Sequence, residues 1–259
     1  MSNTAAVPIL MYHEVTETPH PKFAKYSVTP RAFAAQMRWL ASANYSTISV
    51  PTLIAHRTTG ASIPRRPIVI TFDDGFLDCA RNAGPVLTSH GFSATFFVVA
   101  GLTGGPSTWL RAERGIELPL MSWDDARELE RDGHHCESHS MTHPRLTELS
   151  AAACREELTR SRVVIEQELQ RDVRCLAYPF GSYNDEVREI AAACGYEAAC
   201  TVEQGLSTND DPPLALKRVP VLGGDSLFDF ISRLSTAHTV GDRLSAFAQN
   251  VIGGRASSK

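Results

Sequence analysis

Short apolar runs alternate with helical patterns along this chain, and that alternation constrains the fold more than any other feature. Residues 7–12, 68–70 and 94–99 are almost entirely apolar, and residues 150–170 carry leucine, valine and isoleucine at helical spacing. Strands that are apolar on both faces belong to parallel sheets covered by helices. The alternation therefore predicts an α/β fold with a parallel sheet.

Roughly seven or eight strands can be placed in this way, without an internal repeat, a low-complexity segment or a linker. A chain of 259 residues with this pattern fits a closed barrel in a single domain better than an open sheet. We expect a loose tail at residues 1–6, the folded domain at 7–240, and a C-terminal helix and flexible tail at 241–259. In such a barrel, functional groups stand at the carboxyl ends of the strands.

Composition narrows the range of partners and compartments. The formal net charge of -4 comes with no cluster of basic residues, so nucleic acid is not an expected partner. No window approaches the roughly 20 apolar residues of a transmembrane helix, and no signal peptide is visible at the start. We therefore expect a cytoplasmic protein, unless a leader segment has been removed. The sequence makes no prediction of oligomeric state.

The cysteines are expected to be reduced residues of the core. None of the six belongs to a C-x-x-C pair, and most lie in apolar helical or strand-like patterns. Free cysteine behaves as a small apolar side chain, so this placement favours packing over disulfides or a thiolate metal site.

Two adjacent carboxylates follow the apolar run 68–70, in the segment Thr71-Phe72-Asp73-Asp74-Gly75. Carboxylates are rarely buried unless they are paired or bound to a metal, so a pair at the end of a buried strand indicates a site. Aspartate and glycine are also turn residues, and a solvated turn remains the alternative at this point.

Two histidines, His139 and His143, are separated by four positions. If the segment makes a helical turn, this spacing lets both rings point to one side. Imidazole is the commonest protein ligand for zinc, and two histidines with one carboxylate leave open positions on an ion. The pattern alone is weak in a chain with nine histidines, but it follows a strand-like segment and can face the same rim as Asp74.

Three motifs in order carry a resemblance to a known family. They are the segment 71–75, the segment His139 to His143, and Tyr178-Pro179-Phe180-Gly181. Together they resemble the polysaccharide deacetylases of carbohydrate esterase family 4, the NodB homology domain. The early pair Tyr12-His13 is similar to the rearranged poly-N-acetylglucosamine deacetylase group. The resemblance runs from about residue 7 to 234 and implies a distorted (β/α) barrel with seven or eight strands.

The resemblance also implies roles for the site residues. Asp74, His139 and His143 are expected to bind a divalent metal, most often Zn²⁺, with Co²⁺, Ni²⁺ or Mn²⁺ as other possibilities. The metal lowers the pKa of a bound water and polarises the amide carbonyl. Asp73 is expected to be the general base that takes the proton of that water.

Three further residues complete the implied active site. Tyr178 and Phe180 are expected to line the pocket, with the backbone N–H of Phe180 stabilising the oxyanion. His13 is expected to be the general acid that protonates the leaving amine. The alternative for His13 is a structural role at the end of a strand. His238 is the other candidate acid, although its surroundings match the family motif poorly.

The sequence departs from the family pattern at three places. Ala177 stands where relatives usually have the arginine that holds the base, so Arg218 is our candidate for that support, against an ordinary surface role. The Asp-Trp motif that orients the acid is missing, and Trp123-Asp124 is expected to start a helix instead. Glu137, two residues before a proposed ligand, is expected to be solvated.

These expectations define three readings of function. The first is a metal-dependent hydrolase that removes N-acetyl groups from an N-acetylated aminosugar in an oligosaccharide, polysaccharide or sugar conjugate. The second keeps the fold and the metal but acts on an O-acetyl ester, a formamide or a cyclic amide. The third, an inactive glycan-binding barrel, is disfavoured because both aspartates and both histidines of the motifs are present.

Overall fold

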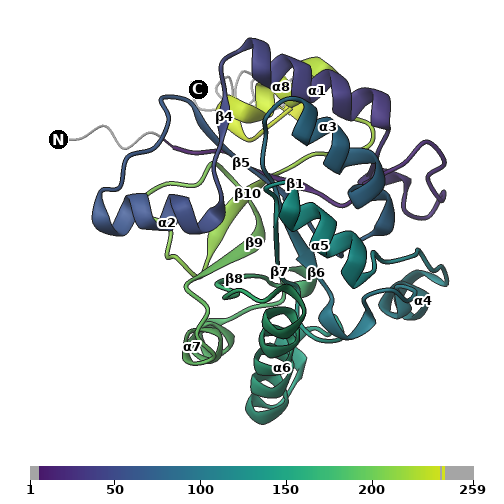
Figure 1. Ribbon diagram of the computed structural model, residues 1–259, viewed down its shortest axis with the longest axis vertical. Helices are drawn as coiled ribbons and strands as arrows, with labels where there is room; N and C mark the ends of the chain where they lie inside the picture. Colours follow the sequence, from purple (N-terminus) through teal and green to yellow (C-terminus); the bar gives the residue numbers. More distant parts are fainter. Residues whose placement is uncertain (1–5, 240, 243–259) are drawn as a thin grey trace, which may run out of the picture.

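Seven parallel strands close into a barrel in the computed structural model, which describes residues 6–239 and 241–242 (Figure 1). The ring closes because β1 pairs on one side with β5, where Leu10 lies opposite Ile70, and on the other with β10, where Leu10 lies opposite Val219. The predicted single-domain barrel is confirmed. In order around the ring the strands are β1 (Ile9–Tyr12), β10 (Leu216–Pro220), β9 (Ala198–Gln204), β8 (Cys175–Ala177), β7 (His135–Ser138), β6 (Thr95–Val98) and β5 (Pro67–Phe72).

Short strands lie outside the ring. The strand β4 (Ser46–Thr47) pairs with the first residues of β5, and it is the eighth strand of the main sheet. A second sheet contains only β2 (Glu14–Val15) and β3 (Ser27–Val28). The expected C-terminal helix and tail at 241–259 fall almost entirely outside the described residues, as does most of the expected tail at 1–6.

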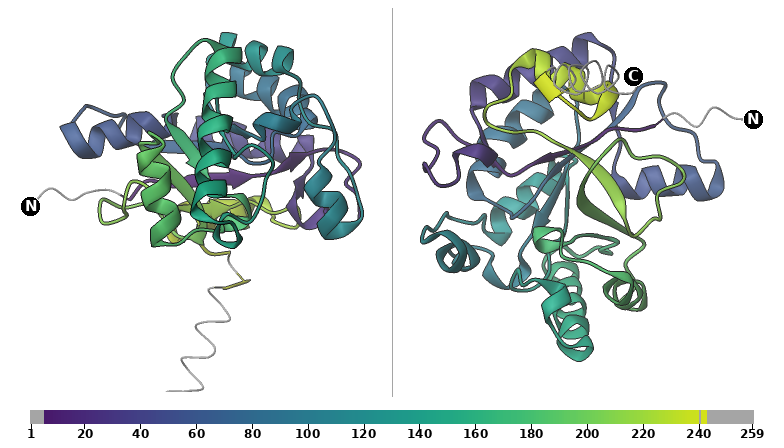
Figure 2. Two further views of the ribbon diagram at one scale, coloured as in Figure 1. Left: turned by 90° about the horizontal axis from the view of Figure 1, so that it is seen from below. Right: turned by 180° about the vertical axis from the view of Figure 1, so that it is seen from behind.

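Helices surround the strands in the views of Figures 1 and 2. Several start at the caps that the sequence indicates: the Thr29 side chain accepts the N–H of Ala32, and Ser122 forms a capping box with Asp125. As expected, Trp123 starts a helix. The α-helices are α1 (Pro30–Ser42), α2 (Val50–Thr59), α3 (Gly84–Ser89), α4 (Thr108–Arg114), α5 (Trp123–Arg131), α6 (Ala151–Leu169), α7 (Asp185–Ala193) and α8 (Leu227–Thr236).

Two apolar clusters fill the domain. The larger one lies between the strands and the surrounding helices, and the smaller one fills the barrel with side chains such as Val69, Phe97 and Leu216. Leu53 and Ile54 of α2 belong to the smaller cluster, together with residues at the start of β1 and β5. The helix α2 therefore covers the amino end of the barrel, and the carboxyl ends of the strands are left for a site.

The structure corrects three element boundaries. Residues 101–120 have little periodicity and several glycine and proline residues, which predicts a loop that could flank a site, but they contain α4, which is too short to show a helical repeat. The sequence predicts that the helix starting near Pro51 stops before Thr58, but α2 continues through Thr59 to the left-handed Gly60, and the hydroxyl of Thr59 bonds the Ala55 carbonyl. The sequence also predicts a helix over residues 76–90 that is interrupted near Gly84, but a π-helix, Cys79–Ala83, runs directly into α3 there.

All six cysteines are free, and all but Cys194 are buried, in agreement with the expectation of reduced core residues. Among the described residues, no helix combines the length and apolar character that a membrane span requires.

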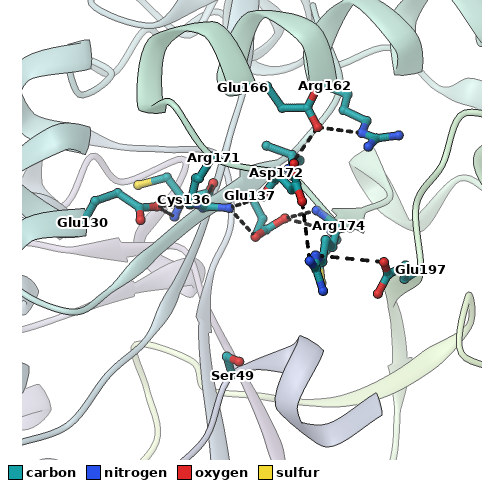
Figure 3. A network of polar contacts seen from close by, with 12 residues as sticks. Ser49, Glu130, Cys136, Glu137, Arg162, Glu166, Arg171, Asp172, Arg174 and Glu197 are labelled. Carbon is teal, nitrogen blue, oxygen red and sulfur yellow. Dashed lines mark hydrogen bonds and ion pairs between the residues drawn. The ribbon is translucent and has the colours of Figure 1, made fainter. Parts of the chain in front are cut away.

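Glu137 on β7 is not solvated, which corrects the sequence expectation. Its side chain is 3% exposed, and it accepts hydrogen bonds from the N–H groups of Arg174 (2.9 Å) and Cys175 (2.7 Å). Arg171, which also bonds Glu130, forms an ion pair with it at 2.9 Å (Figure 3). The partners lie more than thirty residues along the chain, so the short sequence window around Glu137 gives no sign of them. The network ties β7 to the start of β8 beneath the predicted site.

Candidate active site

A buried ion pair joins the first aspartate of the pair to the last strand of the barrel. Arg218 on β10 donates from Nη1 to Asp73 Oδ1 (2.7 Å) and from Nη2 to Oδ2 (2.6 Å). Its remaining bonds go to the hydroxyl of Thr71 (3.1 Å) and, from Nε, to the carbonyl of Thr201 (2.8 Å). The arginine side chain is fully buried, so the surface role considered for Arg218 is wrong.

This pair fixes the charge of Asp73. Burial on its own raises the pKa of a carboxyl group, but the charge and hydrogen bonds of Arg218 outweigh it and lower the pKa of Asp73. The carboxylate is therefore ionised at neutral pH and is held in one orientation by a two-point contact.

Asp74, His139 and His143 form the second group of the site. Their ligand atoms all lie within 4.8 Å of one another, and all three residues are buried. The Nε2 atoms of His139 and His143 are 3.4 and 3.1 Å from Asp74 Oδ1. His139 bonds the Ala177 carbonyl through Nδ1 at 2.7 Å, which directs its Nε2 toward the group.

The two histidines do not lie on a helical turn, which was the condition under which their spacing would direct both rings to one side. The loop after β7 bends at Ser140 and His143, whose φ angles are 65° and 64°. Hydroxyl groups make these bends: Ser138 accepts the N–H of Ser140 at 3.2 Å, and Ser140 accepts the N–H of His143 at 3.0 Å. The rings thus converge by loop geometry rather than by helical periodicity.

Backbone strain is concentrated at the site. Asp74 (φ 72°) and Phe180 (φ 56°) also occupy the left-handed region, as do the two loop residues Ser140 and His143. Residues other than glycine rarely adopt this conformation, and such strain clusters where a structure holds functional groups in fixed positions.

The donor set of this group fits a divalent metal ion such as Zn²⁺. Two imidazoles and a carboxylate are the ligands that zinc takes in catalytic sites. Burial on its own raises the pKa of Asp74, but the hydrogen bonds of the two histidines outweigh this effect and lower the pKa. The carboxylate is therefore charged. Burial lowers the pKa of His143, which favours the neutral ring that a metal needs.

Aromatic rings, rather than a hydrogen bond at Nδ1, support the far side of the His143 ring. Its Nδ1 is buried, with no hydrogen-bond partner among the described residues. The ring of Trp109 on α4 stacks on it with centroids 4.4 Å apart and an interplanar angle of 22°. The Phe180 ring meets it edge-on at 4.5 Å. These two contacts define the orientation of the imidazole.

A cavity of about 310 Å³ opens over these residues. The predicted residues that line it are His13, Asp73, Asp74, His139, His143, Tyr178 and Phe180. This volume is at the small end of ligand sites. Arg218 lies beneath the lining, behind Asp73.

His13 lies in the wall of this cavity, whereas His238 does not. The His13 ring packs against Tyr26 (5.1 Å between centroids) and Phe23 (6.4 Å). Burial lowers the pKa of His13, and the charges of Asp74 and Asp73 raise it in opposition. His238 is exposed beside Gln204 at the end of β9.

Tyr178 and Phe180 line the cavity as predicted, but in different ways. The Tyr178 hydroxyl donates to the Leu214 carbonyl at 3.0 Å, and its ring stacks on Tyr183. Phe180 carries the guanidinium of Arg145 over its face, 4.1 Å from the centroid.

Sequence reasoning missed the outer wall of the cavity. Trp109, Leu110 and Arg114 come from the segment that was expected to be a loop, and Phe23 and Tyr26 come from the loop after β2. The available signal was the presence of large aromatic residues in two stretches without periodicity, since such residues need a partner to pack against.

Comparison with known proteins identifies the family. A family model described as polysaccharide deacetylase matches residues 61–199, more than half of the chain. The chain belongs to the polysaccharide deacetylase family. The predicted family and the predicted enzyme class, a carbohydrate deacetylase, are confirmed.

Relatives of this family member cover most of its length. YxkH of Bacillus subtilis (strain 168), named as a polysaccharide deacetylase, is 29% identical over 222 residues, which are 86% of this chain and 74% of YxkH. A poly-β-1,6-N-acetyl-D-glucosamine N-deacetylase of Staphylococcus aureus (strain MRSA252) is 22% identical over 222 residues, 82% of this chain and 73% of the relative. The structure of the Streptococcus pyogenes deacetylase PplD in complex with acetate superimposes with a TM-score of 0.79 and 25% identity, covering 90% of this chain and 99% of PplD.

The stacking of Trp109 on His143 can be tested through the affinity of the site for Zn²⁺. We expect Trp109→Ala to weaken Zn²⁺ binding about tenfold, because the His143 ring loses the stacking partner that orients it. Calorimetric titration of metal-stripped protein measures this affinity directly. Trp39→Ala, at a tryptophan that packs against Tyr45 and Phe230, is the matched control. Equal affinities for wild type and Trp109→Ala would contradict the proposed support.

Proposed function

We propose that the protein is a metal-dependent hydrolase that removes N-acetyl groups from an N-acetylated aminosugar in an oligosaccharide, polysaccharide or sugar conjugate. The observation that carries the proposal is the two-point contact of Arg218 with Asp73, directly beside the group of Asp74, His139 and His143 on a cavity wall. The substrate named for the Staphylococcus aureus relative supports an N-acetylated sugar.

Asp74, His139 and His143 would hold the metal, with Zn²⁺ as the first candidate and Co²⁺, Ni²⁺ or Mn²⁺ as alternatives. When bound, the ion lowers the pKa of a water molecule and polarises an amide carbonyl. His139 is oriented for this role by the Ala177 carbonyl, and His143 by Trp109 and Phe180.

Asp73 is the general base in this proposal. Both of its oxygens accept hydrogen bonds from Arg218, so the carboxylate is ionised and cannot rotate toward the three ligands. Asp74 forms no ion pair with an arginine of the described residues, and its Oδ1 faces the Nε2 atoms of His139 and His143 instead. Neighbouring carboxylates in such different surroundings take different roles, one moving a proton and one holding an ion.

His13 is the general acid in this proposal, and it gives a proton to the leaving amine. Its ring lies in the cavity wall, to which Asp73 also belongs, and packs against Phe23 and Tyr26. The N–H of Phe180 is our candidate donor to the oxyanion, with the Tyr178 and Phe180 rings as walls for the substrate.

The division of labour between the two aspartates is testable by exchange of each for its amide. We expect Asp73→Asn to keep bound Zn²⁺ and lower acetate release by at least about a hundredfold, because the general base is lost. Asp74→Asn should lose the metal itself. Metal analysis and acetate release from N-acetylglucosamine oligomers of several lengths measure both effects. If Asp73→Asn loses the metal, the assigned roles are wrong.

The same assay distinguishes the alternative substrates. Acetate release from no oligomer of any length, together with turnover of an O-acetyl ester, a formamide or a cyclic amide, would replace our proposal by the second reading. No turnover of any substrate by the metal-loaded protein would favour the third reading, an inactive glycan-binding barrel.

The role of Arg218 can be separated from simple stability. We expect Arg218→Met to destabilise the protein by about 3 kcal/mol or more, because it leaves the Asp73 carboxylate buried without its partner. The double variant Asp73→Asn with Arg218→Met removes both charges, so it should recover stability but not activity. Denaturant unfolding and acetate release measure the two quantities. An active double variant would exclude Asp73 as the base.

His13 is tested against the other candidate acid. We expect His13→Ala to lower kcat about a hundredfold with the metal content unchanged, because proton transfer to the leaving amine is lost. His238→Ala, an exposed histidine outside the cavity, should retain wild-type activity. Near-normal activity of His13→Ala would contradict the assignment and make His238 the next residue to test.

A further inference from the structure

Cationic side chains gather at one side of the cavity mouth. Arg114 is the last residue of α4, and Lys22 and Lys25 lie in the segment between β2 and β3, Lys25 in a 3-10 turn (Ala24–Tyr26). Lys22 Nζ donates to the Arg114 carbonyl at 2.8 Å, and Arg114 Nη1 donates to the Lys22 carbonyl at 2.9 Å. The loop and the helix are thereby fixed to each other, with three positive charges on their outer surface.

The guanidinium of Arg114 lies over two aromatic rings. Its guanidinium carbon lies 5.3 Å from the Tyr26 centroid and 5.7 Å from that of Phe23. Nη1 is used by the Lys22 carbonyl, so Nε and Nη2 are the N–H groups of Arg114 that remain to bind carboxylate or phosphate oxygens at two points. Arg114 also lines the cavity, so these N–H groups lie within reach of a molecule bound there.

No carboxylate in the described part of the chain neutralises Arg114. The acidic residues nearest to it in sequence are used elsewhere: Glu113 pairs with Arg145 at 3.2 Å, and Glu117 pairs with Arg111 at 2.5 Å. Lys22 and Lys25 likewise have no ion pair among the described residues, since Lys22 bonds a carbonyl and Lys25 lies over the Tyr26 ring.

The interior of the cavity does not oppose an anion either. The acidic side chains in its lining are Asp73 and Asp74. Asp73 is neutralised by Arg218, and Asp74 faces two histidines that are suited to a divalent cation. The charge of Asp73 is therefore balanced inside the protein and does not oppose an anion at the mouth.

We propose that Arg114, with Lys22 beside it, is a subsite for an anionic substituent of the substrate. The substituent is a carboxylate or a phosphate on the glycan, carried by a sugar next to the one that is deacetylated in the cavity. The inference rests on the proposed function and sharpens its substrate class to acidic glycans. Arg114 acts here in binding and selectivity and takes no part in the chemical step.

The competing explanation is that Arg114 only fastens α4 to the loop. A fastening role affects every substrate alike, because it acts through the shape of the cavity wall. A subsite instead changes the preference between charged and neutral substrates. The charge of the substrate is therefore the variable that separates the two explanations.

The experiment compares kcat/KM for acetate release from three oligosaccharides of equal length. One is a neutral N-acetylglucosamine oligomer, one carries a lactyl carboxylate on the neighbouring sugar, and one carries a phosphate there. We expect the wild-type protein to prefer an anionic oligomer by about tenfold, the effect of one hydrogen-bonded charge pair. The preference should fall as salt is added, because exposed charges are screened. The arm with the larger preference identifies the anion.

Variants assign the preference to Arg114. Arg114→Gln should reduce the ratio of anionic to neutral kcat/KM to near one, mainly through KM for the anionic oligomer. Arg111→Gln is the matched control: it lies one turn earlier on the same helix, has a 66% exposed side chain and is outside the cavity lining. It should leave the ratio unchanged. The wild-type comparison itself needs no variant, so it stands even if Arg114→Gln folds poorly.

The outcomes separate this inference from the proposed function. Acetate release from the neutral oligomer with no preference for either anionic oligomer overturns the subsite and leaves the deacetylase proposal intact. A preference that Arg114→Gln retains also overturns it. Absence of acetate release from all three oligomers contradicts the proposed function.

Discussion

The contact between Arg218 and Asp73 is the constraint on which the catalytic end of the barrel depends. Two charges taken out of water each lose several kcal/mol of hydration, so such a pair persists only with good geometry and further bonds. Thr71 and the Thr201 carbonyl supply those bonds from β5 and β9. The charge state of Asp73 therefore depends on the register of the three strands β5, β9 and β10.

The sequence was sufficient to predict the parts of the molecule that depend on local residue patterns. Apolar runs specify buried strands, and a carboxylate pair at the end of such a run specifies the carboxyl end of a barrel strand, where Asp73 and Asp74 indeed lie. The motif with His139 and His143 could be assigned to the same rim because strand ends meet there. The family resemblance, and not periodicity, supplied the individual roles.

The remainder depends on contacts between residues far apart in sequence. Glu137 looks like a solvated carboxylate in its own window, and only the fold brings Arg171 to it. Trp109 and Arg114 lie on a helix of seven residues, which is too short to leave a periodic pattern. The histidine loop is bent by the hydroxyl of Ser140 and by left-handed backbone, and the spacing of the two histidines gives no sign of either.

The order of strands around the ring has a consequence for biosynthesis. The two proposed partners in proton transfer, His13 and Asp73, adjoin β1 and β5, whereas Arg218 comes from β10, the last strand in sequence order among the described residues. A nascent chain that ends at β9 already contains the three metal-ligand candidates, but its base has no counter-charge and its barrel has a gap beside β1. Under the proposed mechanism, Asp73 therefore gains its counter-charge only after β10 has been translated and has closed the ring beside β1.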